Sequence, residues 1–183
     1  MAARWGIAVV SLMITVALAG CETDRVGGAP DGDRESSENI GAVELQVPIE
    51  LRGVTQLVPS DAPAPTSAVP ESGTVLPDPD NNQLALYPAF LTLRELDGGE
   101  IVFDEASGTW LINLMLTDDD GAAFARWTQN HVGEQVALIA EGEVIFAPQI
   151  AAPITGGEIQ IAGGTDGYTK TEAGDFLNDI TGR

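Results

Sequence analysis

The chain has 183 residues, with 28 acidic against 8 basic side chains and a formal net charge of −20 at pH 7. This length suits one or two small domains. The charge argues against binding to nucleic acid or, by electrostatics, to anionic lipid headgroups, because both need a basic surface. One Cys and one His are too few for a structural zinc site, an iron–sulfur cluster or a disulfide framework. We therefore expect neither a cofactor nor a metal centre of these kinds.

The start of the chain has the pattern of an export signal. A short positive start is followed by an almost wholly apolar run over residues 5–19, and the tetrapeptide LAGC ends at Cys21. The apolar run is shorter than the roughly 20 residues of a membrane span and has the flanks of a secretory signal. Its end resembles the bacterial lipobox, in which the Cys receives a diacylglycerol. We expect a signal peptide over residues 1–20 and a lipid anchor on Cys21, at the extracytoplasmic face of the cell membrane.

A polar tether precedes the first expected strand. Residues 21–40 are mostly Gly, Ser, Asp, Glu and Arg, which predicts a disordered acidic tether. Apolar and polar residues alternate from Val43 to Arg52, which predicts a strand with one buried face. Pro48 cannot donate a backbone hydrogen bond, so we expect this strand at a sheet edge. Residues 61–82, rich in Pro, Ser and Asp, predict a long loop within a domain over residues 41–183.

Further strands and two helices follow in the sequence. Strands are predicted over residues 84–93, 100–104, 110–116, 136–140, 144–147 and 158–162. A run of three Asp before apolar residues at helical spacing predicts a helix over 119–131. The capping box formed by Thr169 and Glu172 predicts a second helix up to Ile180. The order of elements predicts an α+β fold with a mostly antiparallel sheet and both helices packed on one of its faces.

The second half of the chain carries an ordered series of Gly, Pro and apolar positions that resembles a known family. The positions are Leu116, Thr117, Gly121, Phe124, Thr128, Val132, Gly133, Ala137, Gly142, Val144, Ala147, Pro148, Ile150, Ile154, Gly157, Ile159, Gly163, Glu172, Ala173 and Leu177. They resemble the head subdomain of the periplasmic P1 domain of SecD/SecDF, an auxiliary of protein export. A looser resemblance extends back to residue 43. The family has Asp where this chain has Glu141, and because Asp-Gly suits a tight type I′ turn better, we expect a wider hairpin here.

The resemblance implies a domain with the SecDF P1 head fold that handles client polypeptides. SecD proteins couple proton movement through membrane helices to motions of this head, and no stretch after residue 21 has the length and apolarity of a bilayer span. We therefore expect the client-binding head without the proton-driven mechanism. The expected function is non-catalytic binding of a polypeptide or an envelope partner, and the resemblance implies a role auxiliary to protein export. The candidate partner-binding residues are Val43, Leu45, Val47, Pro48, Ile49 and Trp127.

Two other functions stay open. The protein could be an adaptor lipoprotein that binds one folded envelope partner, or an envelope hydrolase with an acidic cleft. His131, the only His, ends a predicted helix, and no Gly-x-Ser-x-Gly motif accompanies it, so we expect it to interact with the helix dipole.

One short segment has a cation-binding alternative. Asp78, Asp80 and Asn82 have the oxygen spacing that opens a calcium loop, but Gln83 and Ala89 replace the Gly and Glu that complete it. A Pro-Asp turn is therefore predicted, and cation binding stays open.

Lipidation of Cys21 can be tested directly. We expect Cys21→Ala to leave an uncleaved or mislocalised precursor, because the variant lacks the thiol group that receives the lipid. Cell fractionation and the mass of the purified protein measure this. If the variant were cleaved and membrane-bound like the parent protein, the lipobox interpretation would be wrong.

Overall fold

The computed structural model of the protein describes residues 39–59, 62, 72–163 and 167–183. The expected signal peptide, Cys21 and residues 22–38 of the expected tether lie outside these residues. The described elements are β1 (Asn39–Ile40), β2 (Val43–Val58), β3 (Thr74–Pro77), β4 (Gln83–Leu86), β5 (Leu91–Leu96), β6 (Gly98–Asp104), β7 (Thr109–Met115), α1 (Asp118–Asn130), β8 (Val136–Ala140), β9 (Glu143–Phe146), β10 (Glu158–Ala162) and α2 (Lys170–Thr181).

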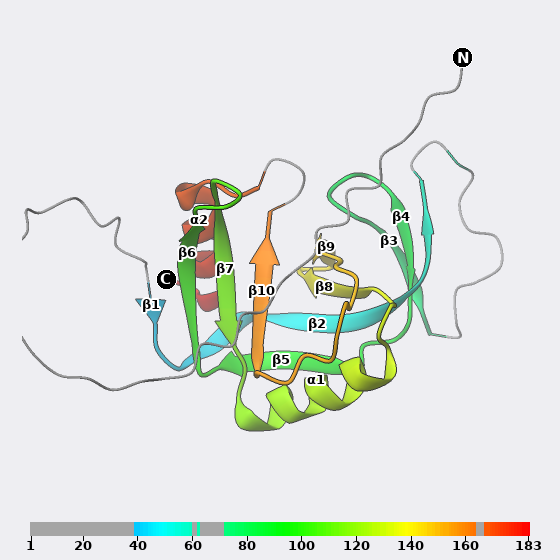
Figure 1. Cartoon of the computed structure of the whole chain (residues 1–183), viewed down its shortest axis with the longest axis horizontal. Coiled ribbons are helices and arrows are strands. Elements are labelled where there is room, and N and C mark those ends of the chain that lie inside the picture. Colours follow the sequence, from blue (N-terminus) through cyan, green and yellow to red (C-terminus); the bar gives the residue numbers. More distant parts are fainter. Residues whose placement is uncertain (1–38, 60–61, 63–71, 164–166) are drawn as a thin grey trace, which may run out of the picture. The chain divides into compact units, whose positions relative to one another are not determined.

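The described strands form two antiparallel sheets (Figure 1). One sheet has the order β1-β6-β7-β10. The other has the order β3-β4-β2-β8-β9, and β5 also pairs with β2. The expectation of a mostly antiparallel α+β fold is confirmed, with the strands arranged in two sheets.

Strand β2 lies in the interior of its sheet. Its residues Glu50 and Leu51 pair with β5 along one edge and with β8 along the other. Further on, β4 pairs with the same edge as β5, from Val54 to Val58. The prediction that Pro48 marks an edge strand is therefore wrong for β2 as a whole. Pro48 is tolerated because it lies where the register of the β2–β5 pairing shifts, between Glu44 and Ile49.

The two helices contact different strands. Helix α2 packs against β2, β6 and β7 and lies behind β6 and β7 in Figure 1, whereas α1 packs against β5. Their inward-facing residues belong to one hydrophobic core, to which α1 contributes Phe124 and α2 contributes Ala173, Leu177 and Ile180. The expectation that both helices cover one face of one sheet is not confirmed.

Both helix starts follow the predicted chemistry. Thr117 caps α1 by accepting a hydrogen bond from the Asp120 N–H, with acidic residues in the first turn. Thr169 and Glu172 form the predicted capping box of α2. The Thr169 backbone N–H and hydroxyl donate to the Glu172 carboxylate and hold its pKa below the usual range.

Three element boundaries differ from expectation. The domain starts before residue 41, because β1 pairs with β6 and Ile40 is buried in the core. The expected loop over residues 61–82 contains β3, which pairs with β4. The expected strand over residues 84–93 is two strands, because Pro88 interrupts the ladder. Around this interruption the Tyr87 and Phe90 N–H groups still donate to β2 carbonyls.

The hairpin between β8 and β9 is tight. Ala140 pairs with Glu143, and the two residues between them, Glu141 and Gly142, have φ angles of 53° and 83°. Positive φ at both central residues is the geometry of a type I′ turn. The expected widening of this hairpin is therefore wrong, and Glu141 adopts a conformation that favours Gly or Asn.

Candidate functional site

A shallow groove lies where β2 continues beyond its pairing with β8. One wall is β2 residues 54–57, and the other is formed by residues 133–135 and Gln149, with Tyr87 also lining the groove. The volume of the groove is about 570 Å³. It is open to solvent, which suits a ligand that lies along a surface rather than a small molecule enclosed in a cavity.

The β2 wall presents a strand edge. Pairing with β8 covers Glu50–Gly53, and the Val54 N–H then donates to the Gln135 carbonyl at 3.0 Å. From Gln56 to Val58, β2 pairs with β4 along one edge, whereas no strand of the described residues pairs with the other edge. Such an edge can accept an added strand through main-chain hydrogen bonds.

The opposite wall is held in place by hydrogen bonds at the base of the β8–β9 hairpin. Gly133 N–H donates to the Ile150 carbonyl and Ile150 N–H donates to the Glu134 carbonyl, both at 2.8 Å. The Gln149 side-chain amide donates to the Gly133 carbonyl at 2.9 Å. The wall is therefore a fixed surface, and a ligand would meet it without reordering the backbone.

An aromatic cluster of Tyr87, Phe90, Trp127 and His131 lies beside Gly53, and Tyr87 is its member that lines the groove. The Trp127 ring is stacked between Phe90 and His131, with ring centroids 4.0 Å away on both sides. Gly53 gives the cluster access to β2, because a Cβ atom at this position would lie 3.1 Å from Trp127 Cζ2 and 3.2 Å from Tyr87 Cδ2. The absence of a side chain at Gly53 thus lets two aromatic rings approach the strand.

His131 has the structural role predicted for it. It caps the C-terminal end of α1, and its Nδ1 lies 2.7 Å from the Trp127 carbonyl. Because a carbonyl oxygen can only accept, Nδ1 carries the proton in this contact. The imidazole therefore closes the end of the helix and supports the Trp127 ring.

Exposed apolar side chains gather beside the groove. Four large hydrophobic residues of the described chain are exposed, namely Leu57 (41%), Tyr87 (48%), Phe103 (44%) and Val132 (49%). Leu57 and Tyr87 line the groove, and Val132 precedes the lining residue Gly133. Since three of the four lie at or next to one groove, this surface is the best candidate for binding an apolar ligand.

The predicted partner-binding residues lie in different environments in the structure. Leu45 and Ile49 are buried in the core, and Val43 and Val47 are half-buried and packed against it. Pro48 is exposed in the irregular part of β2. Trp127 is half-buried in the aromatic cluster, further along β2. The side chains of Val43, Leu45, Val47 and Ile49 thus contribute to the core. None of the predicted residues lines the groove, and Trp127 lies beside Gly53 together with the lining residue Tyr87.

Sequence reasoning missed Leu57, Tyr87, Gln135 and Gln149. They come from four separate segments, and each segment by itself has an ordinary strand or loop composition. Tyr87, which precedes Pro88 and therefore stands at a break in a strand, was the one available signal.

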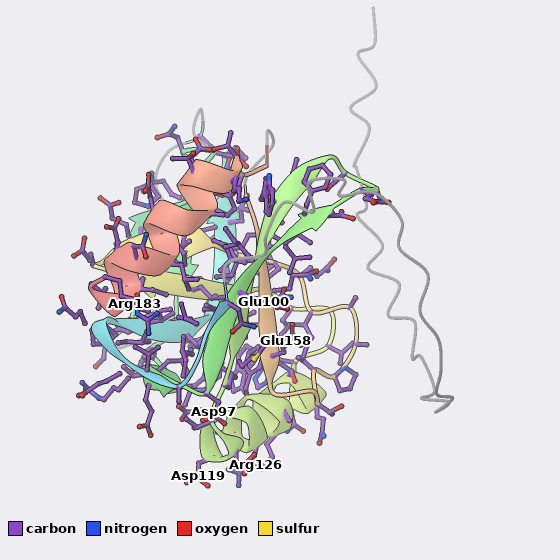
Figure 2. All side chains as sticks on the ribbon, turned by 90° about the vertical axis from the view of Figure 1, so that its left-hand side faces the viewer. Asp97, Glu100, Asp119, Arg126, Glu158 and Arg183 are labelled. Carbon is purple, nitrogen blue, oxygen red and sulfur yellow. The ribbon has the colours of Figure 1, made fainter. Side chains whose placement is uncertain are left out.

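A second, acidic depression has a volume of about 820 Å³ and lies near the start of α1. Its carboxylates are those of Glu44, Glu95, Asp97, Asp118, Asp119 and Asp120. Figure 2 shows Asp97 and Asp119 at the end of the domain where α1 lies. Five of these six residues are exposed, and no group of three or more His, Cys, Asp or Glu within the described residues could hold a metal ion. Surface acids of this kind do not provide the converging, desolvated carboxylates of a hydrolase site.

The segment with calcium-loop spacing forms a turn. The Asp78 carboxylate accepts hydrogen bonds from the Asn82 backbone N–H at 2.8 Å and from its side-chain amide at 3.0 Å. The Asn82 carbonyl also accepts from the Asp78 N–H. These contacts close the connection between β3 and β4 and favour the predicted Pro-Asp turn.

Comparison with known proteins identifies the family. The family described as "SecDF, P1 head subdomain" matches residues 72–177, so the predicted resemblance is confirmed. The protein translocase subunit SecD of Acetobacter pasteurianus is 36% identical over 78 residues, which are 43% of this chain and 15% of that protein. SecD of Acidaminococcus fermentans is 37% identical over 76 residues, 42% of this chain and 18% of that protein. The chain thus spans less than a fifth of these relatives.

A solved structure shares the fold. The structure described as "Structure and function of a membrane component SecDF that enhances protein export" has a TM-score of 0.51 and 24% identity, covering 72% of this chain and 60% of that chain. Within the part of the chain described above, neither helix has the length and apolarity needed to cross a membrane.

Replacement of Gly53 tests the packing beside the groove. We expect Gly53→Ala to lower the free energy of unfolding by about 1–3 kcal/mol, because the new methyl group meets Trp127, which Phe90 and His131 hold on both faces. Gly41→Ala is the matched control, since a Cβ there has no neighbour within 4 Å. Urea unfolding measures both variants. Equal midpoints for the two would show that the aromatic cluster does not constrain β2.

Proposed function

The chain belongs to the SecDF P1 head family, and from this membership we propose that it binds extended polypeptide segments as an extracytoplasmic auxiliary of protein export. Its attachment to the membrane is proposed to be the lipid on Cys21. The two relatives named above are protein translocase subunits. We extend to this chain the handling of polypeptide, without the membrane-spanning part of such a subunit.

The observation that carries this proposal is the edge of β2 beside the groove. Between Gln56 and Val58 the strand is fixed on one side by β4, and its other side borders the groove. An extended segment laid along this edge would continue the ladder that β8 forms with Glu50–Gly53. Main-chain hydrogen bonds supply affinity without requiring one sequence, as binding to many unfolded clients demands.

The chemistry of the groove supports binding rather than catalysis. Its lining consists of apolar, amide and hydroxyl side chains and one carboxylate, that of Glu134. The lining does not include His131, the only His of the chain, which stacks on the Trp127 ring and donates from Nδ1 to the Trp127 carbonyl. We therefore propose a binding module without enzymatic activity.

Site-specific photocrosslinking tests the proposal. A photoreactive amino acid at Leu57 is expected to crosslink a purified exported protein kept unfolded by removal of its disulfides. The same amino acid at Phe103, which has similar exposure but lies on β6, should give at least a fivefold lower yield. The folded form of the client serves as the second comparison and should crosslink weakly from both positions.

Two results would contradict this function. Equal crosslinking from Leu57 and Phe103 would show that the groove is not the binding surface. Capture of one folded envelope protein, with no crosslinking to unfolded clients, would identify the chain as an adaptor lipoprotein instead.

A further inference from the structure

We propose that the groove is selective, and that it takes extended segments with a bulky apolar side chain beside Tyr87 and neutral or basic residues around it. This inference rests on the proposed function and adds a substrate class to it. Three features carry it: the face of β2 on which the aromatic cluster lies, the fixed position of Tyr87, and the distribution of charge.

The first feature is the alternation of side chains in a strand. Successive residues of a strand added beside Gln56–Val58 would point to opposite faces of the sheet. One of these faces is the face of Gly53, against which Tyr87 and Trp127 pack. Every second side chain of the bound segment therefore extends toward the side of the aromatic cluster, where an apolar residue can cover exposed ring surface.

The second feature is the fixed presentation of Tyr87. Its N–H donates to the Gly53 carbonyl at 2.9 Å, and Arg52 Nη1 donates to the Tyr87 carbonyl at 3.4 Å. The backbone of Tyr87 is thus tied to β2, while the residue as a whole remains 48% exposed. The Tyr87 backbone therefore needs no reordering when a ligand covers the exposed ring, and that part of the entropic cost of binding is avoided.

The third feature is charge. Around the groove, Gln56, Gln135 and Gln149 are neutral, and Glu134 is the one charged lining residue. The whole chain carries a formal charge of −20, so an acidic segment is repelled at the groove and in the approach to it. A basic segment is attracted by the same field. The occupant with complementary chemistry is therefore an apolar segment with neutral or basic neighbours.

The experiment uses defined peptides and the protein as expressed. Nine-residue peptides with blocked ends carry Phe or Ser at the centre and Lys or Glu at the flanking positions, and fluorescence anisotropy at low salt measures their affinity. The Phe–Lys peptide should bind about tenfold more tightly than either the Ser–Lys or the Phe–Glu peptide. Raising the salt concentration should lower the affinity for the Phe–Lys peptide and reduce the difference in affinity between the Phe–Lys and Phe–Glu peptides.

Variants locate the selectivity. Tyr87→Ala should reduce the affinity for the Phe–Lys peptide about tenfold and change that for the Ser–Lys peptide less than twofold. Phe103→Ala, which removes a ring of similar exposure on β6, should change neither. Leu57→Ser on the β2 wall is a second test should Tyr87→Ala unfold, and Glu134→Gln should reduce the preference for Lys over Glu.

The outcomes separate this inference from the proposed function. If all four peptides bind alike, or if Tyr87→Ala and Leu57→Ser behave like Phe103→Ala, the selectivity is refuted and polypeptide binding still stands. If no peptide and no unfolded protein binds, polypeptide binding itself is refuted, and the selectivity with it.

Discussion

The backbone pairing of β2 is the interaction on which the rest of the structure depends. This 16-residue strand pairs with β5 and β4 along one edge and with β8 along the other, and α2 packs against it. Its buried side chains Leu45, Ile49 and Leu51 belong to the main core, while Val54 packs against a second, smaller core. A change in the register of β2 would therefore disturb both cores at once.

The groove is a consequence of how this pairing ends. The pairing of β2 with β8 ends at Gly53, and one further hydrogen bond joins the Val54 N–H to the carbonyl of Gln135, the residue before β8. Beyond this point β2 continues beside β4, whereas the segment before β8 connects to α1. Tyr87 also lines the groove, although its backbone N–H donates to Gly53 on the opposite edge of β2, the edge that pairs with β4 and β5. The candidate binding surface thus arises where β2 extends beyond β8, and an exposed sheet edge of this kind can accept an extended peptide as an added strand.

Local chemistry made much of the fold predictable from the sequence. The capping residues Thr117 and Thr169 and the alternation after Val43 act over a few residues, and the structure confirms both helix starts and the strand. The position of β2 within its sheet was not predictable from Pro48, because it depends on partners more than 30 residues away. Tyr87 and Leu57 were not predicted as binding residues for the same reason, because only tertiary packing brings them together at the groove.

Hydrogen exchange along β2 tests strand addition most directly. With a saturating unfolded client, amide exchange should slow between Gln56 and Val58, where an added strand would accept hydrogen bonds. The edge strand β10 of the other sheet, Glu158–Ala162, provides the internal comparison and should show little change. Protection confined to β10, with unchanged exchange in β2 despite bound client, would contradict the assignment of the β2 edge as the polypeptide-binding surface.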